Sequence, residues 1–350
     1  MRPVLKPALS RLWHDGRTLQ LGRGPATSHR YRVTSALRAV VDALDGTRDI
    51  DAVLRYAERI GVHRHDTLDL LDRLAADGCL DDVALDTSAL AALSPAERVR
   101  LDPDLSSLGL RHRLPGGAVR ALDRRRHAIA AVYGLGRVGA QLARRLAAAG
   151  IGTVVPVDSC LVRLEDTGPG TYQDADVGVR RQEAVVRAIR RLAPSTATVL
   201  PPRRTTPDLA LIAPGERPPM ELLATMAESA VPQLLVEVCE DRALLGPLVV
   251  PGRTPCHRCR DLALTDRDPL WPRTLTALAA DGASTRPACD TTLAALAANH
   301  AVLHALAFLD GQLPPSAGAV WEFALPYALP ERREVAVHPA CPCSLHYCGA

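Results

Sequence analysis

Residues 128–139 read Ala-Ile-Ala-Ala-Val-Tyr-Gly-Leu-Gly-Arg-Val-Gly, an apolar run followed by three spaced glycines. The apolar half predicts a buried strand, and the glycines predict a tight turn into a helix over residues 140–149. In such a turn Gly134 permits the sharp reversal, Gly136 lets the backbone approach a phosphate, and Gly139 lets helix and strand pack closely. The pattern is weak on its own, and it favours a Rossmann-like α/β domain.

A second strand is expected over residues 153–157, and it ends at Asp158. In Rossmann-type proteins a carboxylate at this place holds a ribose hydroxyl group. Asp158 therefore joins the three glycines as a candidate nucleotide-binding residue. An NAD-dependent oxidoreductase is one interpretation of this stretch, and the cysteines of the chain count against it.

Two cysteine pairs lie far apart in the sequence, Cys256 with Cys259 and Cys341 with Cys343. Two thiolates on a tight turn can bind one Zn²⁺, and a second pair from elsewhere completes a tetrahedral site of four sulfurs. We therefore expect one structural zinc site. Because the second pair is Cys-x-Cys, Cys348 is a competing ligand, and a disulfide is the alternative to metal.

The composition is that of a soluble intracellular protein. The 350 residues suffice for two domains, and 47% of them are hydrophobic. No run of eighteen apolar residues occurs, and residues 1–6 lack the apolar core of a signal peptide, so neither membrane insertion nor secretion is predicted. We expect a cytoplasmic protein, in which nine cysteines favour metal over disulfides. The net charge of +3, with Lys6 as the single lysine, argues against a nucleic-acid binder.

The first third of the chain predicts a small helical unit with a hairpin. Apolar residues recur at helical spacing in three segments between residues 35 and 82, and residues 11–21 alternate around a turn. We expect a winged-helix-like unit over residues 1–85. Residues 86–124 contain short helical turns and then Leu-Pro-Gly-Gly at 114–117, which suits a linker, so the nucleotide-type domain is expected over residues 125–350.

The small unit offers a surface for a peptide. A hairpin beside three helices leaves an unpaired strand edge, which an extended peptide can extend while its side chains lie against a helix. The candidate peptide-binding residues are Leu19, Leu21, Val33 and Val53, and the alternative is that they form the core of the unit. DNA binding by a winged helix is disfavoured, because the third helical segment carries four aspartates and two arginines.

The nucleotide-type domain expected over residues 125–350 resembles the ThiF/MoeB family of ubiquitin-activating-type adenylyltransferases. The segments that carry the resemblance, in order and spacing, are residues 134–139, 158–162 and 176–184 and a zinc-binding turn at residues 248–259. The resemblance covers about residues 125–350. It implies a mostly parallel sheet that binds ATP and Mg²⁺, adenylation of the C-terminal carboxylate of a small carrier protein, and a structural zinc.

The chain departs from the catalytic pattern of that family. Beyond Asp158, where the family has Asn and Arg, the sequence reads Asp166 and Pro169. Arg181 stands in the place of a phosphate-contacting lysine and keeps the charge without the compact ammonium group. Ala213 begins the stretch where the family has a Mg²⁺-binding acid, and a site without that acid handles Mg²⁺-ATP poorly. We expect a degenerate adenylation site.

A degenerate ThiF-like domain behind a winged-helix-like unit resembles one group more closely. These are the ThiF-like, leader-peptide-binding cyclodehydratase proteins of ribosomal peptide natural-product pathways, which make thiazole and oxazole rings. Residues 2–7, 44–48 and 338–343 carry this resemblance, and the first unit is similar to the peptide-recognition element named after PqqD. The resemblance implies a precursor peptide bound by strand addition and a YcaO-type partner that consumes ATP. A homodimer stays open, and neither nucleic acid nor membrane is expected as a partner.

Other interpretations remain beside this one. An active ATP-dependent adenylyltransferase, acting on the C-terminus of a carrier protein or peptide, is supported by the glycine loop and Asp158. Cys289 is a weaker candidate for a thioester nucleophile. His300 and His304 have the spacing of metal ligands, yet their Ala/Leu-rich helix favours packing histidines. Residues 124–126, three arginines, are expected to be a solvated helix end, and a contact with an anion is the alternative.

Overall fold

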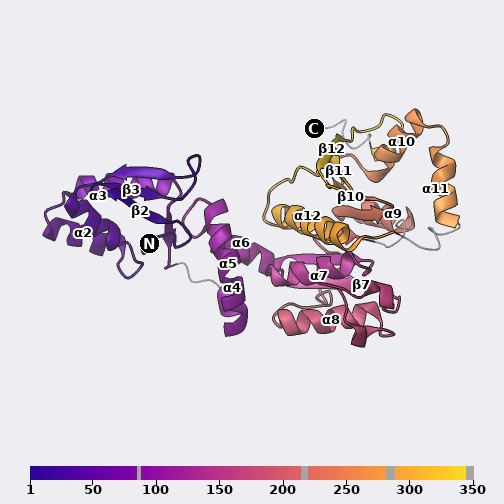
Figure 1. Ribbon diagram of the computed structural model, residues 1–350, viewed down its shortest axis with the longest axis horizontal. Helices are drawn as coiled ribbons and strands as arrows, with labels where there is room; N and C mark the ends of the chain where they lie inside the picture. Colours follow the sequence, from indigo (N-terminus) through magenta and orange to yellow (C-terminus); the bar gives the residue numbers. More distant parts are fainter. Residues whose placement is uncertain (85–87, 214–219, 281–287, 344–350) are drawn as a thin grey trace. The chain divides into compact units, whose positions relative to one another are not determined.

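The computed structural model describes residues 1–84, 88–213, 220–280 and 288–343. The chain divides into two compact units, Met1–Arg124 and Arg125–Ala350 (Figure 1). Each unit has a hydrophobic core of its own, and each is described by itself.

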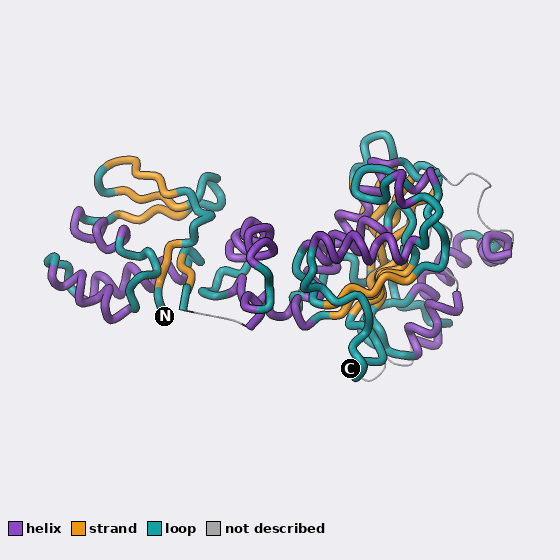
Figure 2. The backbone as a smooth tube through the Cα atoms, turned by 90° about the horizontal axis from the view of Figure 1, so that it is seen from below, coloured by secondary structure: helices purple, strands orange, loops and turns teal. Residues whose placement is uncertain are grey.

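The first unit contains two small antiparallel sheets (Figure 2). One pairs β1 (Pro3–Leu5) with β5 (Leu80–Asp82). The other has the order β2 (Arg11–Asp15), β3 (Thr18–Leu21), β4 (His29–Arg32). The predicted hairpin is β2–β3, and because β3 is central, β2 and β4 are the edges of this sheet.

Three helices follow the sheet where the apolar periodicity predicts them. They are α1 (Ser35–Asp42), α2 (Ile50–Arg59) and α3 (Arg64–Ala76). The side chain of Asp49 accepts a hydrogen bond from the backbone N–H of Ala52 at 2.7 Å, which satisfies one of the open donors at the start of α2. The apolar faces of the helices and of β3 and β4 form one core.

Most of the segment expected as a linker is helical. It contains α4 (Ser88–Ala91), α5 (Pro95–Arg111) and the start of α6 (Gly117–His127). The start of α5 is a capping box, in which Ser94 and Glu97 each accept the other's backbone N–H, with Pro95 in the first turn. The Leu-Pro-Gly-Gly signal therefore marks only the turn between α5 and α6.

The buried Lys6 ties α5 to the rest of the first unit. Its Nζ donates to the carbonyl oxygens of Gly109 at 2.6 Å and Arg113 at 3.0 Å, at the C-terminal end of α5. A cation on the last carbonyls of a helix also interacts favourably with the helix dipole. The side chain is 2% exposed, so this contact is part of the interior of the unit.

The second unit is built on a mixed sheet of seven strands in the order β12-β11-β10-β9-β8-β6-β7. The strands are β6 (Ile129–Tyr133), β7 (Thr153–Val157), β8 (Leu209–Ile212), β9 (Gln233–Cys239), β10 (Arg242–Val249), β11 (Ala319–Ala324) and β12 (Pro330–Glu334). The expected parallel sheet is confirmed from β7 to β9. Beyond β9 the strands are antiparallel, because short turns join β9 to β10 and β11 to β12.

Helices cover both faces of this sheet. One face carries α7 (Gly139–Ala148), α8 (Arg181–Leu192) and α12 (Thr291–Leu309), which share the main core with the strands (Figure 1). The other face carries α9 (Met220–Glu228), whose Leu223 packs with residues of β8 and β9. Two further helices, α10 (His257–Arg267) and α11 (Trp271–Ala280), follow β10.

The helix α12 is long and apolar enough to cross a membrane by length and composition alone. One side of it is buried in the main core, through residues such as Leu293, Ala297 and Ala301. It is therefore the packing helix that the sequence predicts.

A buried ion pair closes the core beside α12. The guanidinium of Arg125, at the end of α6, donates from Nε and from an NH2 nitrogen to the two carboxylate oxygens of Asp310, both at 2.8 Å. Arg125 and Asp310 are 3% and 4% exposed. The expectation of a solvated helix end is therefore wrong at position 125, where the alternative, a contact with an anion, is what the structure shows.

Candidate functional site

A cavity of about 1060 Å³ opens at the carboxyl ends of the parallel strands in the second unit. Its wall includes the last residues of three strands, Tyr133, Val157 and Ile212. In open α/β sheets this edge is where ligands bind. The candidate nucleotide residues Gly134, Gly136, Asp158 and Arg181 all line the cavity, whereas Gly139 lies behind it.

The three glycines of the loop meet different constraints. Gly134 has a φ of +80°, a conformation that residues with a side chain rarely adopt. A Cβ at Gly139 would lie 1.8 Å from the carbonyl oxygen of Gly134, so only glycine allows α7 to approach the loop this closely. A Cβ at Gly136 would meet no atom within 4 Å, so this position leaves the backbone accessible from the cavity.

Two side chains hold the glycine loop through the backbone N–H and the carbonyl oxygen of one residue, Leu135. The carboxylate of Asp158 accepts the N–H of Leu135 at 2.7 Å, and the hydroxyl of Tyr172 donates to the carbonyl oxygen of Leu135 at 2.6 Å. Burial raises the pKa of Tyr172, so its hydroxyl remains a donor. The second oxygen of Asp158 accepts the N–H of Cys160 at 2.7 Å. Asp158 is thus fixed in place before any ligand arrives.

Arg181, the first residue of α8, is held by two carboxylates. Its NH2 nitrogen lies 2.8 Å and 2.7 Å from the two oxygens of Asp166, its Nε lies 3.1 Å from one of them, and its NH1 lies 3.5 Å from Asp158. Burial lowers the pKa of Arg181, but the hydrogen bond and charge of Asp166, together with Asp158, raise it more. One cation therefore stands between two anions, a group with a net charge of −1.

Sequence reasoning singles out Asp166 only as a departure from a family pattern. It gives no sign that this carboxylate is 5% exposed and paired with Arg181. The two residues are fifteen positions apart and lie on different elements, so neither spacing nor periodicity links them. The opposite charges at the two ends of the segment 167–180 are the signal that could have suggested the pair.

The position of the expected metal-binding acid is apolar. Ala213 directly follows β8, is 2% exposed and lines the cavity, and the residues that follow it, 214–219, lie outside the described part of the chain. Ala213 itself offers no carboxylate oxygen for Mg²⁺, and the guanidinium of Arg181 is paired with Asp166.

Two cysteines line the cavity, and neither has the features of a nucleophile. Burial raises the pKa of the Cys289 thiol and of the Cys160 thiol, and the nearby Asp158 raises that of Cys160 further. A thiol with a raised pKa holds its proton at neutral pH, and the thiolate is the reactive form. The carbonyl oxygen of Cys289 accepts a hydrogen bond from Arg137 at 2.5 Å. These observations favour an inert Cys289.

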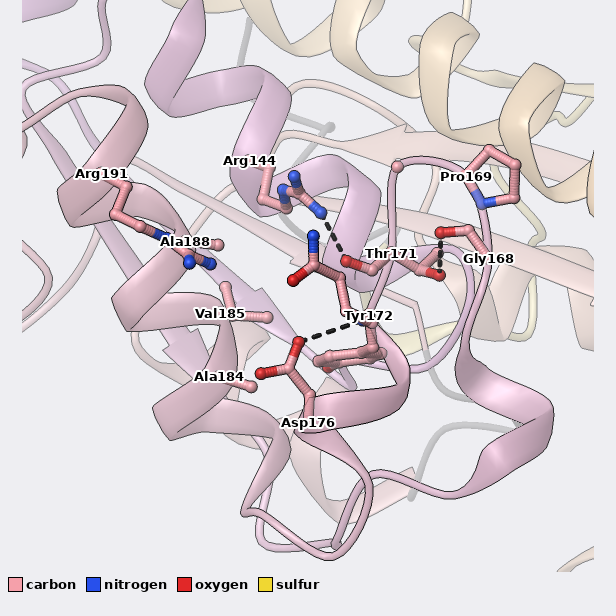
Figure 3. A pocket seen from close by; sticks show the side chains of 12 residues that line it. Arg144, Gly168, Pro169, Thr171, Tyr172, Asp176, Ala184, Val185, Ala188 and Arg191 are labelled. Atoms are coloured by element: carbon pink, nitrogen blue, oxygen red, sulfur yellow. Dashed lines mark hydrogen bonds between the residues drawn. The ribbon is translucent and has the colours of Figure 1, made fainter.

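A smaller cavity of about 330 Å³ lies between α7, α8 and the loop of residues 168–176 (Figure 3). Figure 3 shows Arg144 of α7 pointing to the backbone of Thr171, whose carbonyl oxygen accepts its hydrogen bond. Asp176, at the far end of the loop, pairs with Arg187 of α8 at 3.0 Å. The loop between Asp166 and Arg181 is therefore attached to both helices.

The four predicted zinc ligands come together in the second unit. The sulfur of Cys256 lies 3.8, 3.5 and 3.6 Å from those of Cys259, Cys341 and Cys343, and the sulfurs of Cys259 and Cys343 are 3.2 Å apart. All four sulfurs lie within 4.8 Å of one another. A Zn–S distance of about 2.3 Å gives sulfur separations of about 3.8 Å in a tetrahedron, whereas a disulfide needs about 2.0 Å.

The cluster therefore fits one tetrahedral metal ion. The described cysteines form no disulfide, and Cys348 lies outside the described residues. Among the residues that the structure describes, this is the group of possible ligands that could hold a metal. His300 and His304 instead pack on aromatic rings of β11, with centroid distances of 4.7 Å and 6.3 Å. Burial lowers the pKa of His304 to about 4, which agrees with a packing role.

The four residues predicted to bind a peptide lie inside the first unit. Leu19, Leu21 and Val53 are fully buried and Val33 is 4% exposed, and all belong to its core. The core interpretation fits these positions. Apolar spacing could not separate the two cases, because core residues and pocket residues have the same periodicity.

The outer side of β4 is the exposed feature that remains. In the described part of the chain no strand pairs with it. The N–H of Val33 donates to Arg17 at 2.8 Å on the β3 side. Because donors alternate along an antiparallel strand, the N–H groups of Arg30 and Arg32 point to the outer side. Both side chains are exposed.

Contacts from Tyr31 hold β4 beside the end of α3. The hydroxyl of Tyr31 donates to the carboxylate of Asp77 at 2.6 Å, and His29 lies 3.4 Å from the other oxygen of Asp77. The guanidinium of Arg73 stands 5.6 Å from the centre of the Tyr31 ring. The open edge of β4 therefore lies beside the end of a helix, and an open sheet edge is what strand addition requires.

One segment of this chain matches a known protein family in sequence, and nearly the whole chain is similar in fold to solved structures. Residues 113–213 match the ThiF family. No curated protein matches the chain in sequence. In fold, the chain is similar to E. coli MccB crystallised with ATP, with a TM-score of 0.70 at 15% identity over 98% of this chain and 99% of MccB.

Two further structures are similar over nearly the whole chain. The microcin C7 biosynthetic enzyme MccB in complex with N-formylated MccA gives a TM-score of 0.68 at 16% identity, with 98% and 99% of the two chains covered. PaaA gives 0.69 at 16% identity, with 94% and 99% covered. Identities this low show a shared fold alone. The chain thus carries a ThiF family segment within an α/β fold that it shares with MccB and PaaA.

Proposed function

We propose that this protein binds the leader of a ribosomally made precursor peptide at the open edge of β4. It presents that peptide to a YcaO-type cyclodehydratase in the biosynthesis of a natural product. The observation that carries the proposal is the outer side of β4, where the N–H groups of Arg30 and Arg32 face away from the sheet beside α3. An added strand satisfies such groups and gains affinity from main-chain hydrogen bonds.

Similarity to MccB supports peptide binding. MccB is a biosynthetic enzyme of microcin C7, and one of its crystal structures holds the peptide MccA. The likeness to this chain includes the first unit, because 98% of the chain is covered. Within that unit we propose residues 1–85 as the recognition element, followed by the connecting segment 86–124 and the ThiF-like domain 125–350.

In this proposal the large cavity of the second unit has lost its adenylating role. Arg181 is paired with Asp166, and Ala213 stands where an acid would hold Mg²⁺. The energy for ring formation then comes from the YcaO-type partner, which consumes ATP. We propose that the protein works in the cytoplasm, either alone or as a homodimer, and that nucleic acid and membranes are not among its partners.

The metal in this proposal is one Zn²⁺ held by Cys256, Cys259, Cys341 and Cys343. Four thiolates leave no open position, so the ion has a structural role. It joins the start of α10 to the segment after β12, which are far apart in the chain. Zinc bound in this way contributes directly to folding.

Binding of labelled peptides to the full chain tests the proposal. Synthetic peptides that span the short reading frames beside the gene are labelled, and fluorescence anisotropy measures their affinity. We expect one of them to bind with a micromolar constant or tighter, about −8 kcal/mol. Arg32→Pro removes a donor on the outer side of β4 without breaking the β3–β4 ladder, so it should weaken binding at least about tenfold.

The matched control lies on the opposite edge of the same sheet. The N–H of Gly22 donates to Ser10 at 3.0 Å, so by alternation the N–H of Arg11 points away from β3. Arg11→Pro therefore makes the same chemical change at the other edge and should keep the affinity. Equal affinity of Arg32→Pro and the wild type, or a loss confined to Arg11→Pro, would reject β4 as the binding edge.

An ATP-dependent adenylyltransferase is the second candidate. The observation that favours it is the large cavity behind an intact glycine loop and Asp158, in a fold that MccB uses with ATP bound. Peptide-dependent exchange of labelled pyrophosphate into ATP separates the two candidates. Robust exchange that disappears in Asp158→Ala would replace our proposal with this one.

A further inference from the structure

The guanidinium of Arg181 donates its hydrogen bonds to a carboxylate of the protein itself, that of Asp166. Arginine binds carboxylates and phosphates through the same planar fork of N–H groups. Here the carboxylate of Asp166 accepts three hydrogen bonds of 2.7 to 3.1 Å from Nε and NH2 of Arg181. The remaining NH1 nitrogen faces Asp158 at 3.5 Å. A phosphate that approaches Arg181 must therefore displace a carboxylate or remain outside the first layer of contacts.

Asp166 is also built to stay where it is. It ends the short 3₁₀ helix Leu164–Asp166, and one of its oxygens accepts the N–H of Arg163 at 2.9 Å. The side chain is nearly buried, so moving it into solvent breaks all of these contacts. The following loop is attached to α7 through Arg144 (Figure 3) and to α8 through the pair of Asp176 with Arg187.

The charges around Arg181 also disfavour a phosphate at its guanidinium. Asp158, Asp166 and Arg181 together carry one net negative charge at the base of the cavity, next to the glycine loop. The N–H of Leu135, a donor of that loop, is already bonded to Asp158. A phosphate placed at Arg181 thus meets a group with a net negative charge, and the other arginines of the cavity wall, Arg137, Arg163 and Arg180, lie outside this group.

We propose that Asp166 determines the specificity of this cavity by filling the phosphate-binding fork of Arg181, so that the cavity accepts a nucleoside-like ligand and rejects polyphosphates. The inference rests on the proposed function, in which this cavity does not adenylate. Asp166 acts through Arg181 and is a positioning residue.

The test compares ligands with and without phosphates on the full-length, zinc-loaded protein. Isothermal titration calorimetry measures the affinity of ATP and of adenosine for the wild type, Asp166→Asn and Asp166→Asn with Arg181→Gln. Asp166→Asn keeps the size of the side chain and releases the charge of Arg181. We expect ATP to bind it at least about tenfold more tightly than it binds the wild type, because hydrogen bonds to charged groups exceed one power of ten. The double variant should lose this gain, and adenosine should bind all three alike.

Glu165→Gln is the matched control. Glu165 is the neighbouring carboxylate of the same 3₁₀ turn. It is paired with the exposed Arg163 at 3.6 Å, and among the described residues it does not contact Arg181. Glu165→Gln removes one negative charge and leaves the hydrogen bonds between Arg181 and Asp166 in place. The ATP affinity of this variant should therefore change less than about twofold. Thermal unfolding verifies each variant, and Asp166→Ser replaces Asp166→Asn if the latter does not fold.

Three results would overturn the inference. They are an unchanged ATP affinity in folded Asp166→Asn, an equal gain in Glu165→Gln, or an equal gain for adenosine. Failure of the proposed function looks different, because the wild type would then bind ATP tightly and catalyse peptide-dependent pyrophosphate exchange. An inert wild type with no gain in Asp166→Asn rejects only the role of Asp166.

Discussion

The buried pair of Arg125 and Asp310 makes a quantitative prediction about the second unit. Asp310→Asn keeps the shape of the side chain but leaves a guanidinium that is 3% exposed without its counter-charge. Removing one partner of a buried ion pair costs about 3–5 kcal/mol, whereas replacing both by apolar side chains is often neutral. The two contacts of 2.8 Å make this a well-formed pair, so we expect a loss of about 3 kcal/mol in Asp310→Asn.

Urea denaturation followed by tryptophan fluorescence measures this loss, since the second unit contains Trp271 and Trp321. With a slope of about 2 kcal/mol per molar urea, the midpoint should fall by about 1.5 M. The double variant Arg125→Met with Asp310→Leu should be more stable than Asp310→Asn. A loss below about 1 kcal/mol in Asp310→Asn, or a double variant as unstable as the sum of its single changes, would refute the reasoning.

Other predictions concern the metal, the glycine loop and pH. Cys259→Ser should lower the zinc content measured by elemental analysis from one ion per chain to nearly none and destabilise the second unit, whereas Cys239→Ser, outside the cluster, should retain the metal. Tyr172→Phe leaves the carbonyl oxygen of Leu135 without its donor, so thermal unfolding should show a loss of about 1–2 kcal/mol. Burial lowers the pKa of His304 to about 4, below its unfolded value of 6.5. The neutral form is therefore favoured in the folded state, and its contribution to stability is complete above pH 6.5 and is lost as the pH falls toward 4. Stability curves of the wild type and His304→Phe should diverge in that window, and parallel curves would contradict this account.

Local features of the fold were predictable because neighbours in the sequence decide them. The strand and turn around Gly134 and Gly139 follow from apolar residues and from steric limits within a few positions. The caps of α2 and the cysteine pair Cys256 and Cys259 are local in the same way. These patterns predict that an element exists and where it begins.

Long-range pairings other than the cysteine cluster were not predictable, because one sequence does not say which distant residues meet. Arg125 was expected in solvent, yet its partner Asp310 follows the last helix of the main core. Arg181 was expected to face a ligand, yet it faces Asp166. For Leu19 and Leu21 the sequence leaves both a peptide-binding and a core role open, because periodicity marks a side chain as buried without saying what buries it. The backbone donors of β4 carry no side-chain signal at all.

The single lysine of this chain gives it an unusual chemical surface. Lys6 is buried, with its ammonium group directed to backbone carbonyls, and the chain has no other lysine. Reagents that attack primary amines therefore find almost nothing on the folded protein beyond its amino terminus. If a mixture with an amine-bearing peptide or enzyme is treated with such a cross-linker, nearly every side-chain amine that reacts belongs to the other molecule. Mass spectrometry of the adducts can then assign the lysine of each cross-link to the partner. Amine-reactive cross-linking of this lysine-poor chain is therefore suited to identifying its binding partners.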